Sequence, residues 1–232
     1  MTALIEARAL CKTFTLHERG GLALPVFSGI DFSVRAGDCL ALTGHSGSGK
    51  SSLLRCLYGN YGASGGEVRI RHRNQWLNLT DAAPREVIEV RRQTMAYVSQ
   101  FLRVIPRVST LDIVAEPLRR LGVAAGEARD QAAQWLTRLN LHERLWNLPP
   151  ATFSGGGQQR VNIAHGMIAA LPVLLLDEPT ASLDADNRRV VVEVICAARQ
   201  CGTAVVGIFH DDEVRDKLAS RCLDIEQYRN PL

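Results

Sequence analysis

Lysine is scarce in this sequence of 232 residues: of its 27 lysines and arginines, only Lys12, Lys50 and Lys217 are lysines. No other lysine therefore lies near Lys50 in the sequence that could replace it. The excess of basic over acidic residues is also small, 27 against 24, which gives a formal net charge of +3. That surplus is too weak to indicate a nucleic-acid scaffold, so we expect no nucleic-acid partner.

Paired cysteines and long apolar runs are missing as well. The six cysteines show no C-x-x-C spacing, and most lie among apolar residues, where a free thiol behaves as a small hydrophobic side chain. This usage is typical of a reducing, cytoplasmic compartment. The longest apolar stretch, residues 163–176, is too short to cross about 30 Å of hydrocarbon, and residues 1–10 lack the pattern of a signal peptide. We expect a cytoplasmic protein without direct membrane insertion.

The composition, 46% hydrophobic and 22% charged, is that of an ordinary globular protein and excludes a disordered or collagen-like chain. Short strand-like runs occupy the first 45 residues, and apolar runs at 173–176 and 204–209 are separated by a helical stretch. This alternation predicts an α/β core with parallel strands. Residues 81–148 have a helical character, and the block from about 102 to 150 is expected to interrupt the core as a subdomain.

A phosphate-binding motif stands at residues 44–51, Gly-His-Ser-Gly-Ser-Gly-Lys-Ser, which matches G-x-x-x-x-G-K-[ST] in full. Glycines let the backbone turn so tightly that successive N–H groups point at phosphate oxygens, and the following helix adds partial positive charge at its N-terminus. In such a motif Lys50 reaches the β- and γ-phosphates, and the Ser51 hydroxyl binds Mg²⁺. The candidate nucleotide contacts are Gly44, Ser46, Gly47, Ser48, Gly49, Lys50, Ser51 and Ser52.

Two acids, Asp177 and Glu178, follow the apolar run at 173–176. Ligands of open α/β sheets lie beyond the carboxyl ends of the strands, so both acids are expected beside the phosphate-binding loop. Asp177 suits an outer partner of Mg²⁺, and Glu178 suits the group that polarises an attacking water. Apolar residues followed by Asp-Glu often mark only a strand that meets a polar turn, and it is the pairing with residues 44–51 that points to a nucleotide site.

Residues 153–160, Phe-Ser-Gly-Gly-Gly-Gln-Gln-Arg, resemble the signature sequence of ABC-type ATPases, and the resemblance spans nearly the whole chain. It implies the α/β P-loop NTPase fold of an ABC nucleotide-binding domain, with a mixed β core and a helical subdomain. Residues 1–232 would form a single domain. Its core would comprise residues 1–101 and 151–232, and its helical subdomain residues 102–150.

Further motifs of these ATPases occur in the expected order. Gln100 matches the glutamine that touches Mg²⁺ and the water, Asp184 ends the D-loop, and His210 matches the switch histidine that contacts the γ-phosphate. Phe14 stands where the family places an aromatic side chain against adenine, although an aromatic residue in an early strand can equally belong to the core. The resemblance thus implies Glu178, His210 and Gln100 as catalytic residues. Its implied metal ligands are Ser51, Gln100 and Asp177.

The mechanism implied by the resemblance is that of an Mg²⁺-dependent ATPase that works as a head-to-tail sandwich. ATP on the phosphate-binding loop of one subunit is closed over by Ser154, Gly155 and Gly156 of another, which is a second copy or a different ABC subunit. Two residues depart from the family pattern: Gly157 stands where glutamine or glutamate is common, and His165 where arginine is common. Gly157 leaves open an ATP-binding regulatory scaffold without turnover.

A second resemblance, to one subfamily of these ATPases, lies at positions that the ATPase chemistry does not require. They resemble the L-type ATP-binding subunits (PhnL) of the bacterial carbon–phosphorus lyase system at residues 52–61, 98–107, 137–140, 143–146 and 207–211. This implies a role in phosphonate catabolism, in the formation of ribose 1-methylphosphonate 5-triphosphate or in the later carbon–phosphorus cleavage. The implied partners are the carbon–phosphorus lyase core complex and a second ABC subunit.

A transporter is the alternative, because residues 17–25 and 72–92 carry extensions like those of the lipoprotein-release and macrolide-export branch. In either case we expect the block of residues 100–148 to dock the partner, because an apolar run lies just past Gln100: Phe101, Leu102, Val104 and Ile105. The same four side chains could instead pack the helical subdomain.

Overall fold

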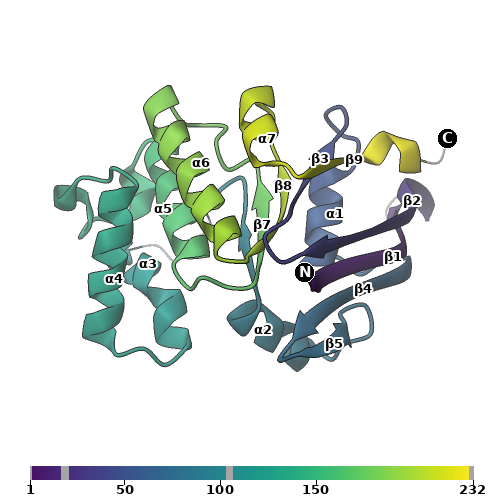
Figure 1. Ribbon diagram of the computed structural model, residues 1–232, viewed down its shortest axis with the longest axis horizontal. Helices are drawn as coiled ribbons and strands as arrows, with labels where there is room; N and C mark the ends of the chain where they lie inside the picture. The colour runs from purple at the N-terminus through teal and green to yellow at the C-terminus, as the bar shows by residue number, and fades with distance from the viewer. Residues whose placement is uncertain (1, 17–20, 103–106, 230–232) are drawn as a thin grey trace.

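Two β-sheets form the centre of the protein, whose computed structural model describes residues 2–16, 21–102 and 107–229 (Figure 1). The first sheet is antiparallel in the order β2-β1-β4-β5, with β1 (Ala3–Leu16), β2 (Leu22–Arg35), β4 (Gly65–His72) and β5 (Gln75–Asn78). The second is parallel in the order β6-β7-β8-β3-β9, with β6 (Met95–Val98), β7 (Val173–Asp177), β8 (Ala204–Ile208), β3 (Cys39–Thr43) and β9 (Arg221–Asp224).

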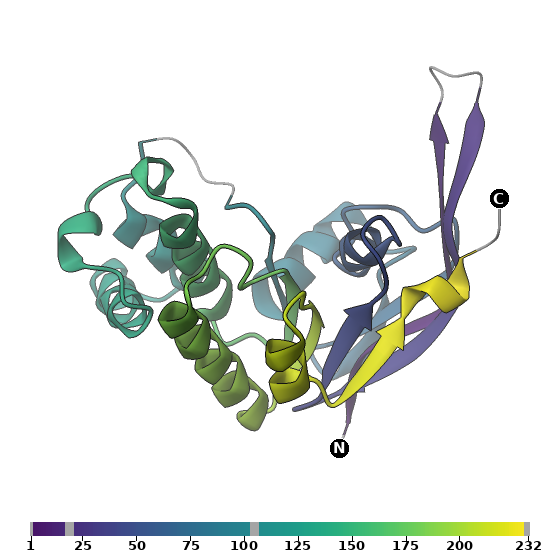
Figure 2. The ribbon, with the colours of Figure 1, turned by 90° about the horizontal axis from the view of Figure 1, so that it is seen from above.

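Helices cover the parallel sheet and extend beyond one end of it. They are α1 (Lys50–Leu57), α2 (Pro84–Gln93), α3 (Thr110–Arg120), α4 (Ala125–Arg138), α5 (Gly155–Met167), α6 (Ala185–Gln200) and α7 (Asp212–Leu218). Short 3₁₀ turns complete the chain at η2 (Glu143–Leu145), η3 (Pro150–Thr152) and η4 (Ile225–Tyr228). Figure 2 shows α3 and α4 at one end and the β1–β2 ribbon at the other, and α5 contacts α3, α4 and β6.

The parallel strands are buried on both faces, and their alternating side chains divide the core into two apolar clusters. Val173 and Leu175 of β7 pack in the cluster that includes α1 and the antiparallel sheet. Leu174 and Leu176 pack in the cluster that joins α3, α4, α5 and α6. β7 therefore connects the two halves of the protein, and its carboxyl end lies where both meet.

The predicted α/β fold with a parallel sheet is confirmed, with helix α6 at Ala185–Gln200 between β7 and β8. The uniformly helical character predicted for residues 81–148 is wrong, because β6 lies inside it. The four residues of β6 are too few to show a strand periodicity in the sequence. They form a strand because they pair with β7, as Tyr97 does with Leu175. The boundaries of the subdomain stay a prediction.

The structure also describes the cysteines and the lengths of the helices. All six cysteines are free thiols, and burial raises the pKa of the Cys56 thiol to about 11. No helix within residues 2–16, 21–102 and 107–229 is both long and apolar enough to cross a membrane.

Candidate functional site: a nucleotide cavity at the carboxyl ends of the parallel strands

The predicted phosphate-binding loop connects buried strand β3 to helix α1, which begins at Lys50. Its backbone has positive φ at three glycines: 129° at Gly44, 81° at Gly47 and 101° at Gly49. A Cβ atom at Gly49 would lie 2.5 Å from Cγ1 of Val26, and one at Gly44 would lie 2.8 Å from Oγ of Ser48. Both positions thus require glycine for conformation and for space.

The loop lines a cavity of about 440 Å³ together with residues that follow three neighbouring strands. The lining residues are Val26, Ser46, Gly47, Gly49, Lys50, Ser51, Ser52, Gln100, Glu178 and His210. Gln100, Glu178 and His210 come after β6, β7 and β8 respectively, so the carboxyl ends of the parallel strands meet here. The volume suits a small ligand.

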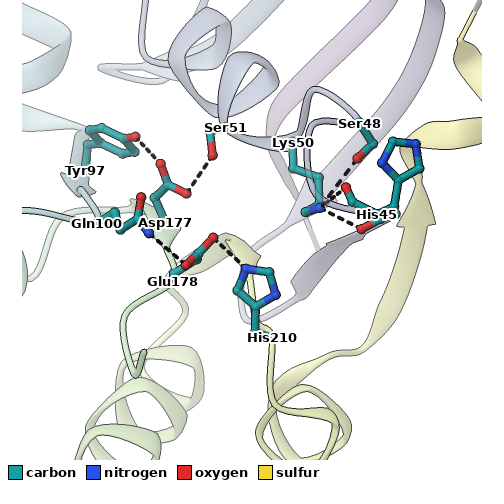
Figure 3. A network of polar contacts seen from close by, with 10 residues as sticks. His45, Ser48, Lys50, Ser51, Tyr97, Gln100, Asp177, Glu178 and His210 are labelled. Atoms are coloured by element: carbon teal, nitrogen blue, oxygen red, sulfur yellow. Dashed lines mark hydrogen bonds and ion pairs between the residues drawn. The ribbon is translucent and has the colours of Figure 1, made fainter. Parts of the chain in front are cut away.

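Lys50 is folded back over the loop and is only 8% exposed (Figure 3). Its Nζ donates to the carbonyls of Gly44 at 2.6 Å and His45 at 2.8 Å, and lies 3.5 Å from Oγ of Ser48. These partners are neutral oxygens, so the ammonium charge remains available to an anion in the cavity. Gly44 and Ser48 thus serve the loop itself and do not line the cavity.

Asp177 lies behind Ser51 and is 2% exposed. Ser51 Oγ donates to its Oδ1 at 3.0 Å, and the hydroxyl of Tyr97 donates to its Oδ2 at 2.9 Å (Figure 3). Burial and the charge of Asp177 raise the pKa of Tyr97, so the phenol stays a donor. Tyr97 was missed in the sequence, because only the alignment of β6 beside β7 reveals its place.

The other two candidate catalytic residues, Gln100 and His210, both contact the carboxylate of Glu178 (Figure 3). Nε2 of Gln100 donates to its Oε2 at 3.0 Å, and Nε2 of His210 lies 2.6 Å from its Oε1. The backbone of Glu178 has φ of 54°, a left-handed conformation that is uncommon for a residue with a side chain and recurs at active sites.

The signature residues lie apart from this cavity. Ser154 caps α5, with its Oγ accepting from the N–H of Gly157 at 3.3 Å, and both Ser154 and Gly155 are exposed. A Cβ at Gly156 would lie 2.8 Å from the carbonyl oxygen of Ser182, so the D-loop packs directly against the signature turn. None of these residues lines the cavity of their own chain.

Asp184 likewise stands outside the cavity, at the N-terminus of α6. Its carboxylate accepts from the backbone N–H of Asn187 at 2.8 Å, and this bond, followed by those from the Asn187 side chain, lowers the pKa of Asp184. The carboxylate is therefore charged near neutral pH, and the residue is exposed to solvent.

Phe14 is also absent from the cavity lining. Its ring meets that of Tyr61 edge to face at 5.3 Å, and Nζ of Lys12 lies 4.6 Å from the Phe14 ring centroid. The side chain is half-buried, so contact with adenine stays a prediction beside the structural role.

Two further sequence features have defined surroundings. Nε2 of His165 lies 3.6 Å from Oε2 of Glu116 on α3, which links the signature helix to its neighbour. In the apolar run after Gln100, Phe101 is 72% exposed, whereas Leu102 packs against the helical cluster. Val104 and Ile105 lie outside the described residues.

The donors in and directly behind the cavity fit a magnesium ion: Ser51 and Gln100 line the cavity, and Asp177 does not line it but contacts Ser51. Ser51, Gln100 and Asp177 offer hydroxyl, amide and carboxylate oxygens, the ligands that Mg²⁺ prefers, and Mg²⁺ in phosphate sites needs only one or two carboxylates besides substrate oxygens. Within the described ranges no group of three or more His, Cys, Asp or Glu residues could hold a metal ion.

Comparison with known proteins gives one consistent family. The ABC transporter family model matches residues 27–181. The chain is 34% identical over 217 residues to the lipoprotein-releasing system ATP-binding protein LolD of Idiomarina loihiensis, covering 93% of this chain and 92% of that protein. It is 35% identical over 222 residues to the macrolide export ATP-binding/permease protein MacB of Brucella melitensis, covering 96% of this chain but 33% of that protein.

A solved structure shows the same fold over the full length. The dimeric post-hydrolysis state of the ATP-binding cassette MJ0796 bound to ADP and Pi superimposes with a TM-score of 0.86 and 27% identity, covering 99% of both chains. Another dimeric structure of MJ0796 gives the same TM-score. With the family match and the relatives above, the chain belongs to the ABC transporter family of ATP-binding proteins.

Proposed function

We propose that this protein is an Mg²⁺-dependent ATPase subunit that converts ATP and water to ADP and phosphate. The observation that carries the proposal is the position of Glu178, held by Gln100 and His210 at the edge of the cavity that contains Lys50. A carboxylate placed in this way can accept a proton from a water molecule that attacks the γ-phosphate.

The other residues have distinct roles in this mechanism. Lys50 and the loop N–H groups bind phosphate oxygens, and the N-terminus of α1 favours the negative charge of the substrate. Magnesium, bound by Ser51, Gln100 and Asp177, would neutralise charge on the β- and γ-phosphates. Gln100 and His210 orient the Glu178 carboxylate, so the base is in place before water is activated.

A second subunit is needed to complete the site. Ser154, Gly155 and Gly156 are exposed or partly exposed and do not line their own cavity, so they are free to close over ATP held by another subunit. The dimeric state of the related cassette MJ0796 supports this arrangement. The partner is a second copy of this chain or another ABC subunit.

The comparisons favour a transporter as the machine that this ATPase drives. The relatives named above serve lipoprotein release and macrolide export, and one of them carries a permease in the same chain. A role in the carbon–phosphorus lyase system is the second candidate, because the framework stretches such as residues 98–107 and 143–146 resemble its L-type subunit. The two candidates differ in the partner that each requires.

Phosphate release measured on the wild type and on Glu178→Gln tests the ATPase itself. We expect turnover by the wild type with its partners, and a loss of roughly a hundredfold or more in the variant, which removes the base while keeping ATP binding. A wild type that binds ATP without turnover would instead support the regulatory scaffold that Gly157 leaves open.

Co-purification identifies the partner. Recovery of a polytopic membrane protein supports the transporter, and recovery of soluble carbon–phosphorus lyase subunits supports the second candidate. Phe101→Asp tests the docking surface in the same experiment, since this side chain is 72% exposed and its replacement leaves the core intact. Full association of Phe101→Asp would assign the docking to other residues.

A further inference from the structure

Asp177 is held by two hydroxyl groups that come from different parts of the fold. Ser51 at the start of α1 donates to Oδ1 at 3.0 Å, and Tyr97 on β6 donates to Oδ2 at 2.9 Å (Figure 3). The carboxylate is 2% exposed, so water cannot readily replace either donor. Its orientation is therefore determined by these two bonds.

Only one of the two donors stands outside the proposed metal site. Ser51 lines the cavity and is itself a candidate ligand, so its hydroxyl serves both Asp177 and the cation. Tyr97 does not line the cavity. Its contact with the site runs through Asp177.

We propose that Tyr97 is a positioning residue that orients Asp177 for magnesium. The inference rests on the proposed function, because it takes Asp177 as a metal partner. A carboxylate bonded at Oδ2 cannot rotate about its terminal torsion without losing that bond, so its Oδ1 stays directed toward Ser51. Groups that hold a metal-binding carboxylate from behind tune metal affinity although they never touch the metal.

Tyr97 is well fixed for this purpose. Its strand position is set by pairing with Leu175, two residues before Asp177 in β7. Its ring lies 5.1 Å from that of Tyr58, and the Arg91 guanidinium lies 4.5 Å from the Tyr58 centroid. Arg91 also donates to the Tyr58 carbonyl at 3.1 Å. Arg91 thus holds Tyr58 in place, and the Tyr58 ring packs against the Tyr97 ring.

The test is the Mg²⁺ dependence of ATP binding in the Glu178→Gln background, where the nucleotide is not consumed. Tyr97→Phe removes the hydroxyl and keeps the ring. We expect the Mg²⁺ concentration for half-maximal ATP retention to rise about 10- to 100-fold, as is usual when the support of a metal ligand is lost. ATP affinity in EDTA should equal that of the parent, which also shows that the variant is folded.

Tyr58→Phe is the matched control. It removes a tyrosine hydroxyl from the adjacent ring, which makes no recorded bond to Asp177, and should leave the Mg²⁺ midpoint unchanged. If Tyr97→Phe fails the EDTA comparison, Tyr97→Met replaces it, because methionine also fills the space without a donor.

The outcomes separate this inference from the proposed function. If the parent binds ATP with no response to Mg²⁺, the metal site itself is wrong. If the parent responds and the Tyr97 variant has the same midpoint, or Tyr58→Phe shifts it equally, the positioning role of Tyr97 is refuted.

Discussion

The signature helix α5 begins with three consecutive glycines, and this gives a quantitative prediction. Ser154 caps the helix, and residues 155–157 form its first turn, with Gly157 donating to Ser154 Oγ at 3.3 Å. Glutamine or glutamate at the third helical position after a serine cap would complete a capping box, in which the two residues bond each other's backbone N–H groups. Gly157 supplies only half of that arrangement.

The change Gly157→Gln should therefore stabilise the protein. Replacing glycine in a helix gains about 0.5–1 kcal/mol, because less backbone entropy is lost on folding. The bond from the Gln side chain to the Ser154 N–H adds about 0.5–1.5 kcal/mol. Against this, the new Cβ would lie 3.0 Å from Cβ of Phe153, which requires a shift of a few tenths of an ångström. We expect a net gain of about 1 kcal/mol, or roughly 2–4 °C in Tm.

Thermal unfolding without nucleotide measures this gain, with Gly157→Ala as the matched control. Alanine makes the same Cβ contact and has the same propensity advantage, but it has no side chain that reaches the Ser154 N–H. The glutamine variant should melt above the alanine variant, and the difference reports the capping bond alone. Equal melting temperatures would refute the capping argument, and destabilisation of both variants would mean that the Phe153 contact dominates.

Three other perturbations follow from single contacts. Asn162→Ala removes the buried donor that lies 2.6 Å from the Ser99 carbonyl and should cost about 1–3 kcal/mol in denaturant unfolding; a loss below about 0.5 kcal/mol would contradict this. Arg188→Gln breaks the 2.6 Å pair with Asp211, next to His210, and should lower kcat for phosphate release several-fold with KM unchanged; a change in KM alone would count against it. Burial acts to raise the pKa of Glu116, but bonds to a histidine and an arginine outweigh it and lower that pKa below 4.5. The ionised carboxylate therefore stabilises the folded protein above that pH, and this stabilisation is lost on acidification. The gap in unfolding free energy between wild type and Glu116→Gln should shrink as the pH falls below 4.5, and a constant gap would exclude this linkage.

The phosphate-binding loop could be predicted from the sequence because its chemistry is local. Residues 44–51 are contiguous, and the positive φ values at Gly44, Gly47 and Gly49 occupy the places where the motif requires glycine. The strand before the loop and the helix after it are also close in sequence, so the pattern carries its own structural context.

The remainder of the site depends on which strands lie side by side, and no short sequence motif predicts that order. Glu178 was predicted from its place after an apolar run, whereas Gln100 and His210 were identified by resemblance. The three side chains meet because β6, β7 and β8 are neighbours in the sheet. Tyr97 had no such motif to mark it. Its contact with Asp177 exists only because the four-residue strand β6 pairs with β7, and this same strand was hidden within a segment predicted to be helical.

In the proposed dimer, the position of α5 would make the two ATP sites mechanically dependent on each other. The helix begins at the Ser154 turn, which on the proposed arrangement closes the ATP of the partner. Further along it, Gln159 donates to the Pro179 carbonyl at 3.1 Å, and Asn162 donates to that of Ser99. These carbonyls adjoin Glu178 and Gln100 of the chain's own site. A helix moves as a rigid element, so a shift of either residue on hydrolysis displaces the signature turn or breaks a buried bond, and ATP turnover should be cooperative in ATP concentration.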